Sequence, residues 1–222
     1  AGENIGDYQI TQGTLSLNSN YNLSFISDYF EITKRPITVT ADPGQTKVYG
    51  TANPDIYTYT ITDGNLVGSD NFNGSIRRYF GEDVGQYTFH QGTLTLSQNY
   101  QLTYVSDVFT ITEASLTLIA DAGHSKIYGD SDPVLTYTTN FQLLPGDSFT
   151  GSLSREDGEN TGIYEINQGT LSPGPNYTTV FVPAEFEIYE KDIVVTADAG
   201  QSKFYGDADS ELTYTTNTPI AS

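Results

Sequence analysis

The sequence predicts a mostly β protein built as a tandem array of small domains, each just under 80 residues long, with little or no helix. Apolar and polar residues alternate in short β-branched stretches such as "ITVTA" (residues 37–41) and "IVVTA" (193–197). Such alternation is typical of half-buried strands. Gly- and Asn-rich joints separate these stretches, and no 3.6-residue periodicity is sustained long enough to predict a helix. The tandem array is predicted by phrases that recur at a fixed spacing.

Two phrases recur along the chain. Tyr49 of "KVYG" is followed by Tyr128 of "KIYG" after 79 residues and by Tyr205 of "KFYG" after 77 more. A second phrase, "GENIGDYQITQGTL", starts at Gly2 and returns twice with the same two spacings. Because both phrases keep one period, they are two halves of a single repeating unit.

The period predicts a half-repeat at each end of the chain and two full repeats between them. The N-terminal half-repeat, the first full repeat, the second full repeat and the C-terminal half-repeat span residues 1–35, 36–113, 114–190 and 191–222. We expect a window cut from a longer array, because the polar joints "TKRP", "TEAS" and "YEKD" lie at equal phase, as linkers between small domains do. In the alternative, the domains are permuted and span 1–68, 69–145 and 146–222.

Composition and charge argue against several classes of protein. The chain has 28 acidic residues against 9 Lys and Arg, a net charge of −19, which disfavours nucleic acid and anionic membrane surfaces as partners. Without cysteine, it has neither disulfides nor a thiolate nucleophile. No apolar run approaches the roughly 18 residues of a membrane-spanning helix, so we expect no membrane insertion of this segment.

The repeated phrases carry a resemblance to a known family. They read T-A-D-x-G-x-x-K-x-Y-G-D-x-D-P-x-L-T-Y-T, then G-D-x-F-T-G-x-L-x-R-x-x-G-E-x-x-G-x-Y-x-I-x-x-G-T-L, then N-Y-x-L-x-F. Together they resemble the MBG ("mostly beta grasp") repeats of bacterial surface and secreted adhesins, over essentially the whole chain. The resemblance implies β-grasp-like domains strung in tandem on extracellular proteins at the bacterial cell surface. The first full repeat departs from the pattern, with "YGTANP" in place of "YGDSDP".

The acidic turn after K-x-Y-G is a candidate calcium site. Asp130 and Asp132 stand at the same phase as Asp207 and Asp209. Calcium binds several carboxylate and carbonyl oxygens, so it is the one cofactor that this turn suggests. The structural interpretation is an Asx turn whose side chains cap backbone N–H groups. The first full repeat lacks both carboxylates, which favours the structural interpretation.

A lysine, a glutamate and an asparagine also keep constant phase in the repeats. Brought together in an aromatic pocket, they could condense into an isopeptide bond, which requires a neutral lysine and an acid that shuttles protons. We favour the alternative, an ion pair from the lysine with the asparagine in a turn. Arg78 and Arg155 share a phase beside the glutamates and predict a further ion pair. The isopeptide candidates are Lys47, Glu82, Asn99, Lys126, Glu159 and Asn176.

No catalytic residue is predicted. His90 and His124 lie at different phases without clustered ligands, and no glycine-rich phosphate loop precedes a helix. We therefore predict a non-catalytic spacer of a large bacterial cell-surface adhesin, in which each repeat has neighbouring repeats as partners. Two alternatives stay open. One is a module that binds a surface glycan or protein between repeats, and the other is a subunit that self-associates head to tail into a filament.

Overall fold

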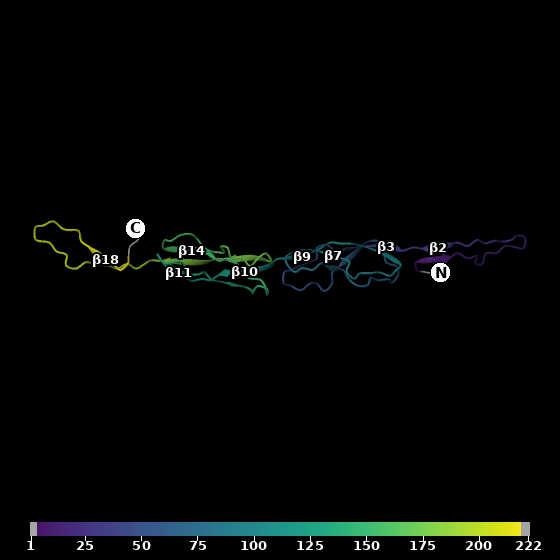
Figure 1. The fold of residues 1–222 in the computed structure, drawn as a ribbon, viewed down its shortest axis with the longest axis horizontal. Helices are drawn as coiled ribbons and strands as arrows, with labels where there is room; N and C mark the ends of the chain where they lie inside the picture. The colour runs from purple at the N-terminus through teal and green to yellow at the C-terminus, as the bar shows by residue number, and fades with distance from the viewer. Residues whose placement is uncertain (1–3, 219–222) are drawn as a thin grey trace. The chain divides into compact units, whose positions relative to one another are not determined.

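The fold consists of short strands throughout. A computed structural model describes residues 4–218, which contain eighteen β-strands and no helix (Figure 1). These strands form repeated small mixed sheets, so the predicted mostly β tandem fold is confirmed. By contacts, the chain divides into two compact units, Ala1–Ala114 with Pro175–Thr178 and Ser115–Gly174 with Thr179–Ser222. Residues 4–218 hold no helix long and apolar enough to span a membrane.

Each full repeat contributes seven strands and each half-repeat two. The half-repeats hold β1 (Gly6–Gln9), β2 (Tyr29–Ile32), β17 (Val195–Ala197) and β18 (Tyr214–Thr216). The first full repeat holds β3 (Arg35–Ala41), β4 (Thr46–Val48), β5 (Tyr59–Asp63), β6 (Arg77–Arg78), β7 (Gly85–His90), β8 (Tyr100–Val105) and β9 (Val108–Thr112). The second holds β10 (Ala114–Ala120), β11 (His124–Ile127), β12 (Tyr137–Thr139), β13 (Ser154–Arg155), β14 (Gly162–Asn167), β15 (Tyr177–Val182) and β16 (Ala184–Tyr189).

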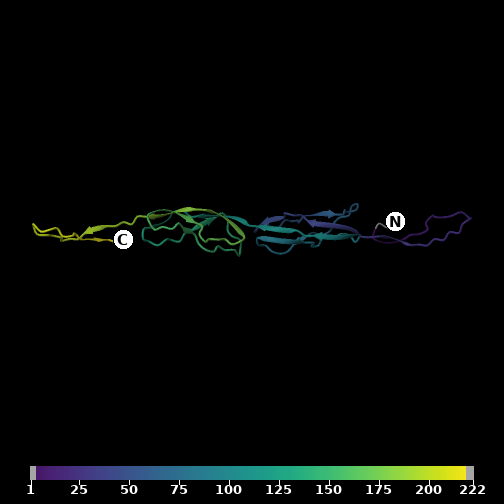
Figure 2. The ribbon, with the colours of Figure 1, turned by 90° about the horizontal axis from the view of Figure 1, so that it is seen from above.

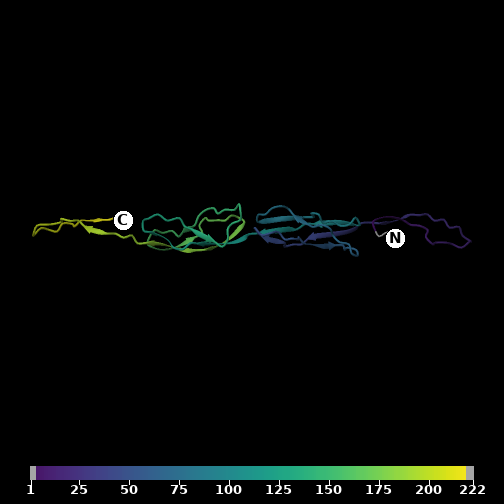
Figure 3. The same ribbon diagram turned by 90° about the horizontal axis from the view of Figure 1, so that it is seen from below.

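The first full repeat is built from two sheets, and two continuous segments of the chain run through both of them. One sheet has the order β5-β3-β8 and the other β4-β9-β7-β6. The pairs β3–β8 and β4–β9 are parallel, and the remaining pairs are antiparallel. Because β3 leads into β4 and β8 into β9, segments 35–48 and 100–112 run side by side in the same direction through both sheets. Figures 2 and 3 show these strands from above and below.

The second full repeat has the same order of strands. Its sheets are β12-β10-β15 and β11-β16-β14-β13, and β11 pairs in parallel with β16. The antiparallel pairing of β14 with β16 joins Gly162 to Ile188, as that of β7 with β9 joins Gly85 to Ile111. The repeated sequence therefore folds twice into one topology.

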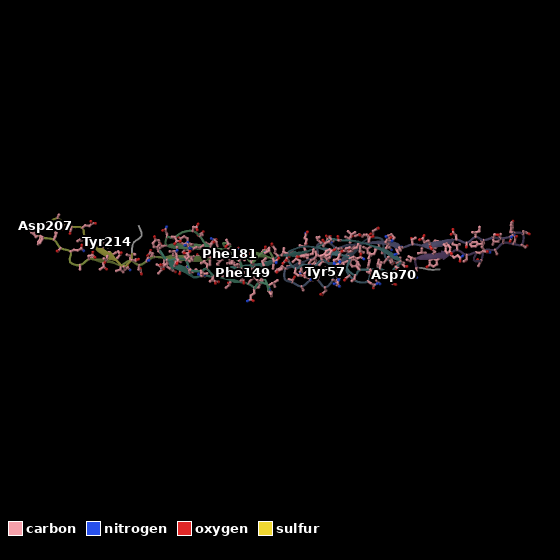
Figure 4. All side chains as sticks on the ribbon, viewed as in Figure 1. Tyr57, Asp70, Phe149, Phe181, Asp207 and Tyr214 are labelled. Carbon is pink, nitrogen blue, oxygen red and sulfur yellow. The ribbon has the colours of Figure 1, made fainter. Side chains whose placement is uncertain are left out.

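Each full repeat has its own hydrophobic core. Along β3 the buried residues are Ile37, Val39 and Ala41, since alternate side chains of a strand face the same side. The first core is Ile37, Val39, Ala41, Ile76, Phe89, Leu94, Tyr100, Phe109 and Ile111. The second contains Leu118, Ala120, Leu153, Ile166, Leu171, Phe186 and Ile188. Figure 4 labels Phe149 and Phe181, two half-buried side chains packed against the second core.

The half-repeats keep the pairing of the full repeats without their core. Strands β1 and β2 pair Gly6 with Ile32, the same register as β7 with β9. Phe30 is 61% exposed, whereas Phe109 and Phe186 at the same phase are 0% exposed. Strands β17 and β18 likewise form an antiparallel pair, and Tyr214 of β18, labelled in Figure 4, is exposed.

Candidate functional site

The lysine of the K-x-Y-G phrase lies inside each full repeat. Among the described residues, Lys47 and Lys126 are the two buried charged residues. Each occupies an inward position of a short strand, β4 or β11, whose neighbours on both sides are more exposed. Lys203, at the same phase in the C-terminal half-repeat, has 47% of its side chain exposed. The full repeat therefore buries a charge that the half-repeat leaves in water.

In the second full repeat, two cations alternate with two carboxylates. Lys126 Nζ lies 2.7 Å from Asp132 Oδ1 and also pairs with Glu159 Oε2. Arg155 Nε lies 2.7 Å from Asp132 Oδ2, and Arg155 Nη2 lies 2.7 Å from Glu159 Oε1. The guanidinium also covers aromatic rings, since its Cζ is 5.2 Å from the Tyr164 centroid and 5.1 Å from that of Phe186. This four-residue network ties the acidic turn to the turn that begins at Gly158 and Glu159.

The first full repeat builds the same network with one carboxylate fewer. Lys47 pairs with Glu82 Oε2, and Arg78 Nη2 lies 2.5 Å from Glu82 Oε1. Asn53 replaces the aspartate, and its Oδ1 accepts a hydrogen bond from Arg78 Nη2 at 2.9 Å. Lys47 Nζ instead donates to the carbonyl oxygen of Thr51 at 3.1 Å. A neutral turn can therefore satisfy the same cations through amide and carbonyl oxygens.

The charges of the second network reinforce one another. The hydrogen bond from Arg155 holds the pKa of Asp132 below its usual value, with a further contribution from Lys126. The hydrogen bond from Lys126 lowers the pKa of Glu159, as the one from Lys47 lowers the pKa of Glu82. In return, Asp132 and then Glu159 raise the pKa of Lys126. All four groups are therefore held in their charged forms.

The structure places the calcium candidates at the end of a turn, as for Asp130 and Asp207, or two residues after it, as for Asp132 and Asp209. Asp132 is bound by Lys126 and Arg155, and Asp209 pairs with Lys203. The backbone N–H groups of Asp130 and Asp207 close the turns at residues 127–130 and 204–207, which contain the Tyr-Gly of K-x-Y-G. Within residues 4–218, no three His, Cys, Asp or Glu side chains are grouped so that they could hold a metal ion. Lysine ammonium groups thus stand where a cation would meet two of these carboxylates.

The isopeptide candidates are brought together only in part. Lys47 meets Glu82, and Lys126 meets Glu159. The asparagines make other contacts, because Asn99 bonds to the turn at residues 4–5 and Asn176 to the turn at 83–84. A raised pKa also keeps Lys126 as an ammonium ion, which is not nucleophilic. The geometry is that of an ion-pair network.

Sequence reasoning missed the full role of the arginines. Their shared phase indicated the pairs with Glu82 and Glu159, and both pairs are present. The shared phase did not indicate that Arg155 also forms an ion pair with Asp132, or that its guanidinium covers the ring of Tyr164. The available signal was that the lysine, the arginine and the glutamate each keep a constant phase in both full repeats, and that the second full repeat adds the acidic turn.

The network is suited to structural support. A hollow of about 530 Å³ lies beside it, lined by residues that include Asp132, Arg155 and Glu159. Because Arg155 already binds both carboxylates, the three groups offer a ligand little unpaired polarity. The network therefore cross-links turns from distant parts of each repeat.

Comparison with known proteins agrees with the repeated geometry. The family model described as MBG domain (YGX type) matches residues 37–110 and 116–187, which cover the Tyr-Gly of both buried-lysine turns. No curated protein matches the chain. The two matches lie in tandem and together cover more than half of the sequence. The chain therefore belongs to the family of MBG domains of the YGX type.

Proposed function

We propose that this chain is a non-catalytic spacer within a large adhesin on the outer surface of a bacterial cell, and that its task is to transmit mechanical load. The observation that carries the proposal is the parallel pairing of the segments that begin and end a full repeat. Arg35 pairs with Tyr100 at one end of these segments, and Val48 pairs with Thr112 at the other.

This pairing sets the direction of load within the repeat. A pull on the chain at residue 35 and an opposite pull at residue 112 draw the two parallel segments past each other lengthwise. The hydrogen bonds of both ladders then carry the load together, because they lie across the direction of sliding. A pull at adjacent ends would instead open the bonds one after another. The repeat is thus arranged to resist extension from its ends.

Two further features support a spacer. In both full repeats, the lysine and arginine networks tie together turns from distant parts of the repeat. The net charge of −19 keeps neighbouring fibres apart by repulsion. Placement outside the cell and on an adhesin accords with the resemblance of the repeats to MBG domains of surface proteins.

Single-molecule force measurements test the proposal. The chain has no cysteine, so pairs of introduced cysteines can serve as handles in the full chain. Handles at Lys34→Cys and Glu113→Cys apply shear, whereas handles at Lys34→Cys and Gln101→Cys pull at adjacent ends. We expect the shear pair to unfold at a force several-fold higher. Equal forces for the two geometries would contradict the proposal.

A second candidate function is self-association through the half-repeats. The N-terminal half-repeat corresponds to the half that carries β7–β9, and the C-terminal half-repeat to the half that carries β3–β5. Both expose residues whose counterparts are core residues, such as Phe30 and Ile193. Opposite halves of two copies would bury these faces. We expect sedimentation velocity to show concentration-dependent growth that Phe30→Asp abolishes, and a strict monomer at high concentration would refute this candidate.

A further inference from the structure

Two asparagines make the same unusual contact in the first compact unit. Asn99 and Asn176 stand at one phase, each directly before a buried tyrosine. Asn99 Oδ1 accepts a hydrogen bond from the backbone N–H of Ile5 at 3.1 Å, and its Nδ2 donates to Asn4 Oδ1 at 2.9 Å. In both cases the asparagine belongs to one repeat and the turn to the repeat that precedes it in the chain.

The second contact repeats the first with a different partner side chain. Asn176 Oδ1 accepts from the N–H of Val84 at 2.9 Å, and its Nδ2 donates to Asp83 Oδ1 at 3.0 Å. Residues 175–178 accordingly lie within the first compact unit, although they belong to the second full repeat. Each asparagine side chain therefore forms hydrogen bonds with one backbone N–H group and one side chain of a G-E-x-x-G turn.

The turn that receives the asparagine is held in shape by its own tyrosine. Tyr8 Oη donates to the carbonyl oxygen of Asn4 at 2.8 Å, and Tyr87 Oη donates to that of Asp83 at 2.7 Å. Tyr164 makes the same bond to Asn160 at 2.8 Å, in a turn that no asparagine contacts within the described residues. The turn thus has this shape without an asparagine docked on it, and it offers a preformed surface.

The backbone of each asparagine also holds the linker between repeats. The carbonyl oxygen of Asn99 accepts from the N–H of Arg35 at 2.9 Å, and that of Asn176 accepts from the N–H of Ala114 at 3.0 Å. Beside Asn176, the Tyr177 ring meets the ring of Tyr49 edge to face, with centroids 5.4 Å apart. Tyr49 belongs to the K-x-Y-G phrase, so both recurring phrases of the sequence meet the Asn-Tyr pair.

We propose that the Asn-Tyr pair of each repeat is a recognition element for the G-E-x-x-G turn of the repeat before it. The side chain at the first x of that turn determines which side chain is tolerated at the asparagine position. The partner is another repeat of the same kind. The proposal concerns the pairing of neighbouring repeats and does not require that the chain carries load.

The selectivity follows from the donors and acceptors of each group. An amide offers both a donor and acceptors, whereas a carboxylate only accepts. In Asn176→Asp, a carboxylate would face the Asp83 carboxylate, and the two would repel. In Asn99→Asp, the new carboxylate would face Asn4, whose amide can turn to donate. The same substitution should therefore break one joint and spare the other.

Amide hydrogen exchange in the full chain, followed by NMR, tests this directly. We expect Asn176→Asp to speed exchange of the Val84 amide about tenfold, a factor at the upper end of the range for losing one hydrogen bond between neutral groups. Adding Asp83→Asn should restore slow exchange, because an amide again faces the carboxylate. Asn99→Asp should leave exchange of the Ile5 amide within about threefold of its original rate.

Two controls distinguish loss of the asparagine contact from unrelated effects of substitution and from unfolding. Asn20 stands at the same phase and bonds through its backbone to Asn18, so Asn20→Asp should change neither the Ile5 nor the Val84 amide. The amide of the core residue Phe186 reports whether a variant is folded, and Asn176→Ala replaces Asn176→Asp if it is not. Unchanged Val84 exchange in both Asn176 variants, or no rescue by Asp83→Asn, would overturn the proposal. Neither result would bear on the unfolding force under shear.

Discussion

Lys126 Nζ lies 2.7 Å from Asp132 Oδ1, and only 4% of the lysine side chain is exposed. An ammonium group taken out of water is costly unless charges and hydrogen bonds replace its hydration. The second full repeat supplies two carboxylates for this purpose, Asp132 and Glu159. The first full repeat supplies Glu82 and the carbonyl oxygen of Thr51. Each full repeat therefore stabilises its own buried lysine, but with a different set of oxygen acceptors.

The first prediction concerns acid stability of the second full repeat. The pKa of Asp132 is lowered, chiefly by Arg155, so its stabilisation is present above its unfolded pKa of about 4 and is lost as the pH falls through its folded pKa. Asp132→Asn should therefore lower stability at pH 7 by about 1 kcal/mol or less, since the carboxylate is 40% exposed. It should also flatten the decline below pH 4.

Urea unfolding at pH 7 and pH 3, followed at core signals of the second full repeat, measures this effect. Asp130→Asn is the matched control, because Asp130 is exposed in the same turn and contributes a backbone N–H to it. An equal change of pH dependence in the two variants would show that the pairing of Asp132 does not cause it.

The second prediction is that calcium does not stabilise the folded chain. Lys126 and Arg155 occupy the oxygens of Asp132, and Lys203 occupies Asp209. A calcium ion would have to displace a charge that is already paired. We expect the same thermal midpoint in millimolar calcium and in chelator. A midpoint that rises with calcium concentration would indicate binding to the folded state and contradict this interpretation.

Sequence patterns within a few residues correctly predicted features that depend on neighbouring residues, such as strands and their buried faces. The alternation at Ile37, Val39 and Ala41 predicted a strand with one buried face, and β3 has that face. The constant phase of the lysines predicted a shared role, and both full repeats bury the lysine. Periodicity could not supply its partners, because Lys126 and Glu159 are brought together by strand pairing across 33 positions.

The asparagines mark the limit of reasoning from one period. Their constant phase was compatible with a place beside the lysine of the same repeat, although we favoured a turn. Asn99 instead contacts Asn4, 95 positions away in the preceding repeat. A recurring residue can act on its own repeat or on its neighbour with the same periodicity. The sequence pattern alone therefore could not distinguish a site within a repeat from a joint between repeats.

The third prediction uses the half-repeat as an internal control for the core. Phe186 is fully buried, so Phe186→Ala should lower the free energy of unfolding of the second full repeat by about 3–5 kcal/mol. Phe30 stands at the same phase but is 61% exposed, so Phe30→Ala should change stability by about 0.5 kcal/mol or less. Urea unfolding of both variants measures the difference. Similar losses would mean that Phe30 is buried in solution.

The fourth prediction concerns Gly81, the first glycine of the G-E-x-x-G turn at residues 81–85. A Cβ added at Gly81 would lie 2.0 Å from Cε1 of Tyr87, the residue that holds the turn through Asp83. Gly85 has nearly the same positive φ, +156° against +151°, but open space where its Cβ would lie. Both Gly→Ala substitutions carry the backbone strain of this φ. Gly81→Ala should cost about 1–3 kcal/mol more, because it also displaces the ring.

A double-mutant cycle separates the collision from the strain. In a Tyr87→Ala background the ring is gone, so the cost of Gly81→Ala should fall to that of Gly85→Ala. The unfolding free energies of the four chains, from urea titration, give the coupling between Gly81 and Tyr87. A coupling near zero would mean that strain alone accounts for the loss. A coupling of the expected size would tie the tyrosine of one recurring phrase to the turn on which the next repeat docks, because Val84 of that turn donates to Asn176.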